Sequence, residues 1–563
     1  RLKDAETLLS RAVSLDEKAW DAWNSLGNIR ADRGDRAGAI QAYERALELN
    51  PAFTLCHANI CRNYLEGGLV GKAVDAAKIA LEDPKIDPTT ALFPISVLQT
   101  VGDFAALKDI HADLWGFMAK VPAPKLEGAL LGMLPRVVSA QDRAALFQAQ
   151  CRWGEAYQAA ADKSPLGSSP TSPAPITSQG TKLRVGFLSS DIRQHNVAKF
   201  VLPILEYFDR RRMELHCYSS WLGQADRIEG VAATLATGFK RLENATQRQV
   251  AEIIRADGMD VVIEMNGLTR HTRAPALAWQ PAPVQVEWLG YPYTMGMRGI
   301  GHFLVDRHMA PTADGHRTEE LITLPESWIC LDPRDRFKVG FAPVPPTKKT
   351  PAEERGHITF GTLNKPYKFT PTLLQSWGRI LARVAGSKLL IARPEAHDAV
   401  FRDTLIRSFA DAGVDSDRLM FATNQPGQHL THYNAIDIAL DTFPQVGGTT
   451  TCEALWMGCP TISLVGDEVF ERMGLSILTN AGLADLCAET VEEYENCAVA
   501  LAEDRSRLTH LRATLRDAMT QGPLGQVDAF VEGWERALIE TRNGVGQNIG
   551  SKVVKTTDVG KSA

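Results

Sequence analysis

The chain has 563 residues, of which 44% are apolar and 23% are charged, with 44 Gly and 30 Pro. This composition excludes a globally disordered or collagen-like chain, and the length suggests about three or four domains. The net charge of −6, from 61 basic and 67 acidic residues, argues against a dedicated nucleic-acid-binding protein, which normally carries a basic excess. The sequence has no apolar run of about 18 residues and no signal peptide, so no membrane partner is expected.

The nine cysteines are scattered and form no CxxC pair, so most of them are expected to be small core residues. This usage predicts a reducing, cytoplasmic compartment. The first residue is Arg1 and not Met, which predicts a truncated or processed start.

A helical repeat characterises the first part of the chain. Small and aromatic residues recur at the spacing of a helix-turn-helix unit of about 34 residues, namely Trp23, Leu26, Gly27, Gly34, Ala39, Tyr43, Ala46 and Pro51. A shift by one repeat places Gly34 on Gly68 and Ala39 on Ala73. The pattern resembles the tetratricopeptide repeat, with one strong, one degenerate and one half copy. Stacked repeats of this kind present a concave surface that binds another protein's extended segment.

The chain changes character after a segment rich in Pro, Ser and Thr, whose composition builds no core. Short apolar runs then alternate with helical stretches, which predicts parallel sheets covered on both faces. The first series of strands is expected at 183–189, 259–265, 283–289 and 302–306, and the second at 357–363, 388–392, 419–422, 438–442 and 461–465. Two doubly wound domains in tandem would form a ligand cleft between the carboxyl ends of their strands.

These patterns divide the chain into seven segments. They are tetratricopeptide repeats at 1–84, degenerate helical repeats at 85–163, a Pro/Ser linker at 164–181, an N-terminal Rossmann-like lobe at 182–345, a C-terminal lobe at 346–526, a closing helix at 527–543 and a disordered tail at 544–563.

Several common cofactor motifs are missing from the sequence. The segment LRVGFLSSD has one glycine where a dinucleotide fingerprint needs three, and neither a Walker loop nor HExxH occurs. The motif Asp415-Ser416-Asp417 precedes a predicted strand instead of following one. We therefore interpret it as a turn and not as a metal site.

Two strand-end segments of the first lobe carry candidate chemistry. The segment SSDIRQHN brings Asp191 and His195 to the end of a strand, where an imidazole suits proton transfer near neutral pH. A purely structural histidine is the alternative. The segment WLGYP contains Gly290, which permits a close backbone approach, and Pro292, which fixes the chain beyond it. Here a simple strand-ending turn is the alternative.

The segment NKPYKF in the second lobe carries Lys365 and Lys368 after a strand. Charge-assisted hydrogen bonds from lysines, worth about 1.5–3 kcal/mol each, are suited to phosphate oxygens. A solvated lysine pair explains the segment equally well.

The segment LDTFPQVGGTTTCEALWMG, 440–458, is typical of an anion site. Two glycines precede Thr449 at the start of a predicted helix, whose N–H groups, hydroxyls and dipole attract anions. The alternative is that Thr450 and Glu453 form a capping box, which satisfies the donors of the helix without any ligand.

In their order along the chain, SSDxxxH, MNG, PAPxQxxWLGYP, YK and LDT…GxTTxxxxLWxGxP resemble the motifs of the O-linked N-acetylglucosamine (O-GlcNAc) transferase family, bacterial type. The resemblance covers residues 20–543. It implies an α-helical tetratricopeptide-repeat superhelix followed by α/β structure, with two Rossmann-like doubly wound domains facing a cleft, as in GT-B glycosyltransferases. The C-terminal lobe would then bind the nucleotide sugar.

The resemblance also implies roles for individual residues. His195 and Asp191 match an active-site histidine and aspartate proposed to act in removing the acceptor proton, and Lys368 matches a lysine on the leaving diphosphate. His429 matches a histidine that stacks on uracil, and Glu453 stands where an aspartate binds the ribose. The other matches lie near the sugar or the diphosphate, and they are Leu289, Gly290, Lys365, Tyr367, Gly448, Thr449 and Thr450.

Some positions depart from the family pattern. Gly448 replaces a histidine that reaches the donor, Pro426 replaces a lysine near the nucleoside, and Lys365 occupies a glutamine position. Pro88 and Thr89 replace a histidine pair that lines the animal site.

The sequence thus predicts an inverting, metal-independent glycosyltransferase that moves N-acetylglucosamine from UDP-GlcNAc to Ser or Thr hydroxyls. The acceptors would be proteins or peptides held by the repeats, and no cofactor, metal or nucleic acid is expected. Two alternatives remain open. One is the same fold with another nucleotide sugar or acceptor, and the other is a peptide-binding scaffold with a weakly active transferase region.

Overall fold

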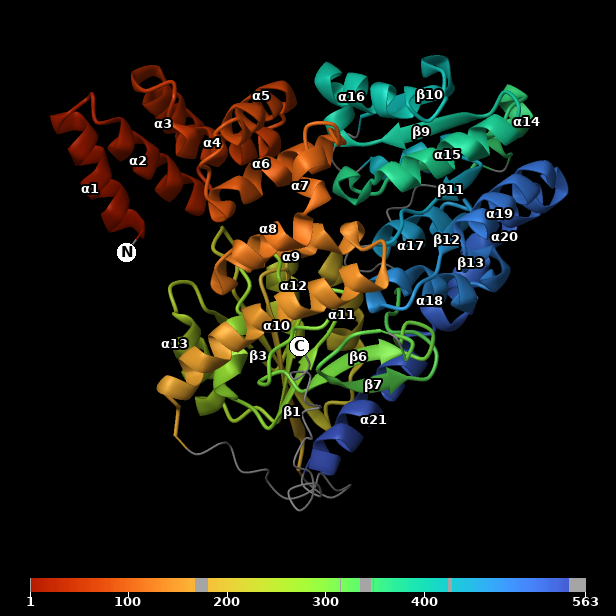
Figure 1. The fold of residues 1–563 in the computed structure, drawn as a ribbon. Helices are drawn as coiled ribbons and strands as arrows, with labels where there is room; N and C mark the ends of the chain where they lie inside the picture. Colours follow the sequence, from red (N-terminus) through yellow and green to blue (C-terminus); the bar gives the residue numbers. More distant parts are fainter. Residues whose placement is uncertain are drawn as a thin grey trace, which may run out of the picture.

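The structure is a computed structural model that describes residues 2–167, 181–313, 315–334, 346–347, 349–423 and 428–545. A stack of helices leads into a seven-stranded α/β lobe, which is followed by a six-stranded α/β lobe (Figure 1). Most of the expected linker and tail, together with Pro426, lies outside the described residues.

The first helices pack as antiparallel hairpins, and they are α1 (Leu2–Leu15), α2 (Trp20–Asp32), α3 (Arg36–Leu49), α4 (Thr54–Glu66) and α5 (Val70–Leu81). Helices α2 and α3 approach so closely that a Cβ on Gly27 would lie 2.6 Å from the Tyr43 ring. Ala39, Ala46 and Ala73 are fully buried. The small residues of the repeat pattern therefore lie at the helix crossings, as predicted.

A second helical region separates these hairpins from the lobes, and it contains α6 (Pro88–Val101), α7 (Lys108–Ala112), α8 (Leu114–Lys120), α9 (Glu127–Met133) and α10 (Ala140–Lys163). Buried amides join α10 to the first lobe, since Gln150 donates to the Met295 carbonyl and Gln158 to the Ala278 carbonyl, both at 3.1 Å. These bonds fix the helical region against the lobe that follows it.

The first lobe is an all-parallel sheet with strand order β3-β2-β1-β4-β5-β6-β7. Its strands are β1 (Leu183–Ser189), β2 (Met213–Ser219), β3 (Gly238–Arg241), β4 (Val261–Glu264), β5 (Val284–Glu287), β6 (His302–Asp306) and β7 (Glu320–Leu324). Its helices are α11 (Asn196–Tyr207), α12 (Arg227–Leu235) and α13 (Gln247–Ala256). The four expected strands are present, and β2, β3 and β7 were not predicted.

The second lobe repeats this winding with strand order β10-β9-β8-β11-β12-β13. Its strands are β8 (Thr359–Thr362), β9 (Lys388–Ala392), β10 (Leu419–Ala422), β11 (Ile438–Leu440), β12 (Thr461–Leu464) and β13 (Cys487–Ala488). Its helices are α14 (Pro351–Arg355), α15 (Pro371–Arg383), α16 (Ala399–Ala410), α17 (Thr449–Trp456), α18 (Met473–Asn480), α19 (Val491–Glu503) and α20 (Arg505–Gln521). Both sheets therefore have the strand order of a doubly wound fold.

The last helix, α21 (Val527–Val545), follows the second lobe in sequence but packs against the first. Its fully buried Trp534 stacks on Phe187 of β1, with ring centroids 5.9 Å apart. The buried Arg542 pairs with Asp260 at 3.2 Å. Helix α21 consequently completes the first lobe from the far end of the chain (Figure 1).

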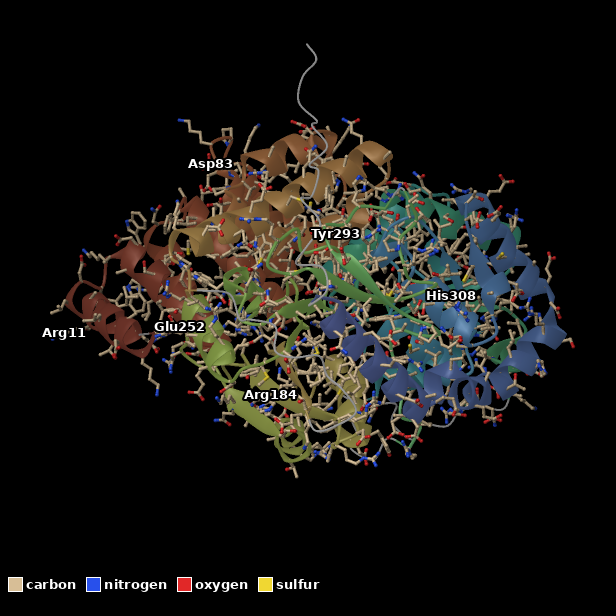
Figure 2. All side chains as sticks on the ribbon, turned by 90° about the horizontal axis from the view of Figure 1, so that it is seen from below. Arg11, Asp83, Arg184, Glu252, Tyr293 and His308 are labelled. Atoms are coloured by element: carbon tan, nitrogen blue, oxygen red, sulfur yellow. The ribbon has the colours of Figure 1, made fainter. Side chains whose placement is uncertain are left out.

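The repeats contact both lobes. Arg270 of the first lobe donates to the Ala31 carbonyl at 3.1 Å, and the His397 ring of the second lobe lies 3.0 Å from the Gly68 carbonyl. Figure 2 shows Arg11 of α1 at one end of the molecule and His308 of the first lobe far from it, so the free end of the repeat stack projects away from the lobes. Within the described ranges, no helix is both long enough and apolar enough to cross a bilayer.

Candidate functional site

The segment after β1 is held by a buried polar network. Asp191 accepts a hydrogen bond from the Asn266 amide at 3.0 Å, and the same amide donates to the Ser190 hydroxyl at 2.8 Å. The Asn266 side-chain carbonyl accepts from the Ser190 backbone N–H at 2.7 Å. Since Asn266 follows β4, the neighbour of β1 in the sheet, the network fixes Asp191 at the carboxyl edge of the first lobe.

His195 caps the start of α11 and faces Asp191. Its Nδ1 accepts from the Val197 N–H at 3.4 Å and lies 3.7 Å from the Asp191 carboxylate. In the neutral ring the proton then belongs to Nε2, which becomes a donor. The ring is 40% exposed, yet partial loss of water lowers its pKa below 6.5, with Arg193 and Lys365 adding to the effect against Asp191. Burial therefore favours the neutral form of His195.

The WLGYP segment makes the close backbone approach that its glycine predicts. A Cβ on Gly290 would collide with the backbone of Met265 and Asn266, and Leu289 has a φ of 82°. Only glycine fits at position 290, and Leu289 is held in a left-handed conformation next to it. The segment thus packs directly on the turn that carries Asn266.

Two carboxyl groups lie buried beneath these segments. Glu264 ends β4, Glu287 ends β5, the two are paired in register, and neither is exposed. Glu264 accepts from the backbone N–H groups of Asn266 at 3.1 Å and Gly267 at 2.6 Å. Neither carboxyl oxygen of Glu287 has a hydrogen-bond partner among the described residues, and a buried charge without partners is costly, so burial favours the protonated form of Glu287. Burial raises the pKa of Glu264 to about 7 and that of Glu287 well above its usual value, and the neighbouring Glu264 adds to the rise at Glu287.

Lys368 lies in a buried position at the carboxyl edge of the second sheet, within the short helix η4 (Pro366–Lys368). Its ammonium donates to the Val446 carbonyl at 2.8 Å and to the Asn364 side chain at 3.3 Å. Burial lowers its pKa to about 8, although Asp441 opposes the shift. Lys365, three residues earlier, is exposed. The two lysines therefore occupy different environments, and Lys368 is not part of a solvated pair.

Asp441 organises the loop between β11 and α17. Its buried carboxylate accepts from the Gly447 N–H at 2.7 Å, from the Asn364 amide at 3.1 Å and from the Ser463 hydroxyl at 3.0 Å. A Cβ on Gly447 would lie 2.6 Å from the Thr451 hydroxyl, so this tight turn needs glycine. The loop delivers the half-buried Thr449 and Thr450 to the first turn of α17.

The capping box expected at Thr450 and Glu453 is wrong. Helix α17 begins at Thr449, its N-cap is Gly448, and no side chain caps it. Glu453 instead accepts from the Lys199 ammonium at 2.9 Å and lies 3.1 Å from the His429 ring in η7 (His429–Ala435). The Glu453 carboxylate therefore binds Lys199 of the other lobe and not the backbone N–H groups of α17.

The ion pair between Lys199 and Glu453 joins the two lobes, since Lys199 belongs to α11. Each side chain is 8% exposed. Burial disfavours the charged carboxylate, but the hydrogen bond of His429 and the charge of Lys199 lower its pKa overall. Lys199, Glu453 and His429 thus form one cluster between the lobes. The nucleoside roles that the family resemblance gives to Glu453 and His429 stay a prediction.

Sequence patterns missed several residues that build this site. Asn266 was visible only within the MNG motif and Asp441 within LDT, whereas Lys199 lies in a helix with no motif around it. The Asp415-Ser416-Asp417 motif forms a turn before β10, at the amino end of the edge strand. It therefore lies at the opposite edge of the sheet from Lys368 and α17.

Comparison with known proteins agrees with this geometry. Residues 168–341 and 347–533 match the model of glycosyl transferase family 41, and residues 20–53 match the tetratricopeptide repeat. The chain belongs to glycosyl transferase family 41. This membership confirms the expected family and its combination of repeats with two Rossmann-like lobes.

Among solved structures, a mutant of the O-GlcNAc transferase from Thermobaculum terrenum is similar over 97% of this chain and 96% of its own, with 26% identity and a TM-score of 0.72. The expected GT-B type of fold is thereby confirmed. A curated protein from Hordeum vulgare described as probable UDP-N-acetylglucosamine--peptide N-acetylglucosaminyltransferase SPINDLY is 34% identical over 362 residues, covering 63% of this chain and 38% of its own. A Caenorhabditis elegans UDP-N-acetylglucosamine--peptide N-acetylglucosaminyltransferase is 24% identical over 64% of this chain and 40% of its own. The chain spans about two fifths of the length of these curated relatives.

The inter-lobe ion pair generates a testable double-mutant cycle. We expect Glu453→Gln to lower the free energy of unfolding by about 3–5 kcal/mol, because it leaves the Lys199 ammonium buried without its counter-ion. Adding Lys199→Met should restore most of that loss. Urea unfolding of both single variants and the double variant measures the coupling. Additive effects of the two substitutions would contradict a direct pair.

The buried carboxyl pair predicts a pH dependence of stability. The folded state holds a proton more tightly than the unfolded state, so stability is complete below about pH 4.5 and is lost as the pH rises through about 7. The loss is about 1.4 kcal/mol for each unit by which the pKa is raised. Glu287→Gln should reduce this loss, because a neutral amide donates to Glu264 without titrating.

Thermal unfolding between pH 5 and pH 8 tests this expectation, with Glu532→Gln on the exposed side of α21 as the matched control. A Glu287→Gln variant that loses as much stability over this range as the wild type would show that the pair does not titrate there.

Proposed function

We propose that this chain is an inverting glycosyltransferase that moves N-acetylglucosamine from UDP-GlcNAc to Ser or Thr hydroxyls of proteins. Its membership in family 41 and the printed descriptions of its relatives support this donor and these acceptors. The observation that carries the proposal is geometric. Lys368 and the uncapped start of α17 lie at the carboxyl edge of the second sheet. The Lys199–Glu453 pair joins this edge to α11, whose first turn carries His195 beside Asp191.

In the proposed reaction the acceptor oxygen attacks the anomeric carbon of the sugar while the bond from that carbon to the diphosphate oxygen breaks. The bonding electrons leave with UDP, and the acceptor proton passes to a base. Negative charge develops on the diphosphate, where a preorganised donor set is most effective. Lys368 and the N–H groups and hydroxyls at Thr449 and Thr450 are the groups we assign to that charge. Burial lowers the pKa of Lys368, and the negative charge of a bound diphosphate would raise it again and so stabilise the ammonium form.

His195 and Asp191 are the candidate bases. His195 is neutral, as a base must be, but its Nδ1 is engaged by the Val197 N–H, so Nε2 carries the proton in this arrangement. The imidazole can accept the acceptor proton at Nδ1, beside Asp191. After a change of tautomer that moves its own proton to Nδ1, it can accept the proton at Nε2. We assign the sugar surroundings to Leu289, Gly290, Tyr367 and Lys365, and the nucleoside to His429, Gly448 and Glu453, on the strength of the family resemblance.

We further propose that the reaction needs no metal, because Lys368 and the start of α17 supply the positive potential that a cation would otherwise provide. The protein acceptor would be held by the repeats, which contact both lobes through Arg270 and His397. A cytoplasmic location is part of the same proposal. The replacement of family residues at Gly448 and at Pro88-Thr89 favours one second candidate, which is the same fold acting on another nucleotide sugar or acceptor.

The direct test is calorimetric titration with UDP in the presence of a chelator, followed by incubation with a panel of UDP- and GDP-sugars and mass spectrometry of the peptides. We expect UDP to bind without divalent cations and peptides to gain the mass of one N-acetylhexosamine from UDP-GlcNAc. Binding that a chelator abolishes and Mg²⁺ restores would refute the metal-free mechanism. Transfer from a different donor in the panel would establish the second candidate.

Substitution of the base and of the diphosphate ligand should have different effects. His195→Asn keeps a side-chain acceptor for the α11 cap but removes the imidazole, so we expect transfer to fall by about 10²–10⁴-fold with little change in UDP affinity. Lys368→Met should lower UDP affinity and turnover together. Calorimetry and single-turnover rates measure both quantities. Transfer by His195→Asn at close to the wild-type rate would assign the proton to Asp191 or to the donor itself.

A further inference from the structure

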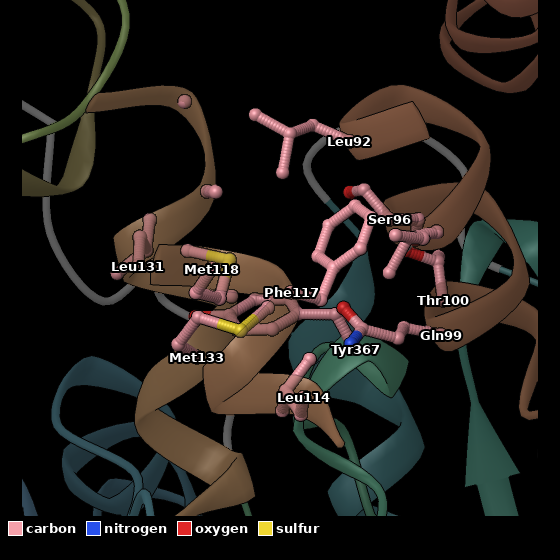
Figure 3. Close-up of a pocket in the computed structure, with 14 residues that line it drawn as sticks. Leu92, Ser96, Gln99, Thr100, Leu114, Phe117, Met118, Leu131, Met133 and Tyr367 are labelled. Carbon is pink, nitrogen blue, oxygen red and sulfur yellow. The ribbon is translucent and has the colours of Figure 1, made fainter. Parts of the chain in front are cut away.

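A cavity of about 150 Å³ lies between α6, α8 and α9 of the second helical region and closes against Tyr367 of the second lobe (Figure 3). Aliphatic and thioether side chains form its walls, among them Ile95, Leu114, Met118 and Met133. All four are buried. None of the described residues that line it is charged. A dry cavity of roughly this size holds a guest as large as benzene.

Gln99 is the buried polar side chain of this wall, which also includes Ser96 and Thr100. It is 2% exposed, it lines the cavity, and its Nε2 has no hydrogen-bond partner among the described residues. Figure 3 shows Gln99 entering from the α6 side, opposite Leu131. A buried amide without a partner is costly. A ligand that offers a carbonyl oxygen beside an apolar group would remove that cost.

The cavity opens to solvent and also adjoins the donor site. Ser96 and Gly128 at its rim are exposed. On the inner side the Tyr367 backbone carbonyl accepts from Arg136 at 2.7 Å, which ties the second helical region to η4. The Tyr367 side chain contacts Gln445, in the loop that leads to α17. One tyrosine therefore separates the cavity from the loop to which we assign the diphosphate.

We propose that this cavity binds one apolar side chain of the acceptor polypeptide, of the size of Leu, Met or Phe, and that Gln99 donates to a backbone carbonyl beside it. The inference rests on the proposed function. A charged ligand would find no opposite charge among the residues that line these walls. The cavity then selects acceptors by a residue a short, fixed distance from the modified hydroxyl.

Gly132 of α9 offers a clean way to fill the cavity. It lines the space, and a Cβ added there would meet only the Gln99 side chain, at an ordinary 3.7 Å. Gly132→Leu therefore places an apolar side chain in the cavity without a backbone clash. Gly230→Leu is the matched control, because Gly230 is exposed on α12 and a Cβ there meets nothing within 4 Å.

The probe is a peptide library with one central Ser and randomised flanks, incubated with UDP-GlcNAc and sequenced after modification. We expect the wild type and Gly230→Leu to enrich Leu, Met or Phe at one position by about tenfold, the factor that corresponds to burial of an apolar side chain. Gly132→Leu should abolish that enrichment while it hydrolyses UDP-GlcNAc in the absence of peptide at the wild-type rate.

The outcomes separate this inference from the proposed function. Transfer without any apolar preference, or a preference that Gly132→Leu leaves unchanged, overturns the role of the cavity alone. A wild-type protein that neither hydrolyses the donor nor modifies any peptide overturns the proposed function. Gln99→Met, which keeps the cavity apolar, should preserve the enrichment but slow transfer several-fold, and an unchanged rate removes Gln99 from the contact.

Discussion

The Lys199 ammonium and the Glu453 carboxylate meet where the two parallel sheets present the carboxyl ends of their strands to each other. Taking both charges out of water is expensive, and their attraction offsets this cost only while the geometry is good. The pair is therefore sensitive to the relative position of the lobes. If the lobes moved slightly apart, the attraction between the two charges would weaken while the cost of their desolvation remained. Glu453 also contacts His429, so the relative position of the lobes and the arrangement of the nucleoside site are set by the same carboxylate.

Sequence patterns predict the strands that are buried on both faces, because continuous apolar runs mark them whatever their neighbours are. They fail at β2, β3 and β7, which contain half-exposed or exposed residues, and at β13, which has two residues. The site shows the same division. The segments that follow the carboxyl ends of β1 and β11 could be predicted as site segments, because polar motifs follow apolar runs there. The partner of Glu453 could not be read in this way, because Lys199 lies 254 positions away in a helix of the other lobe. A capping box is a local rule, and it gives way when a buried charge from a distant segment offers a stronger partner.

The polar groups behind the site form layers. Asn266 contacts Asp191 directly, Glu264 holds the turn of Asn266 through two backbone N–H groups, and Glu287 is the register partner of Glu264 on the neighbouring strand. Asp191 is 8% exposed and Asn266 1%, whereas Glu264 and Glu287 are both fully buried. The protonation of the deepest pair is thus linked through backbone geometry to the orientation of the carboxylate beside His195. The candidate base Asp191 is therefore supported by the backbone at the edge of the sheet and not by a flexible side chain.

Helix α21 places the last described part of the chain in the core of the lobe that is made early. During synthesis the strands of the first sheet leave the ribosome long before Trp534 and Arg542, which cover β1 and pair with Asp260. Until α21 is made, Phe187 is not packed against Trp534, and Asp260 is not paired with Arg542. The first lobe must accordingly wait for the second to be translated before it reaches its final packing. A chain whose synthesis stops before residue 527 would therefore lack the residues that complete the core of the first lobe.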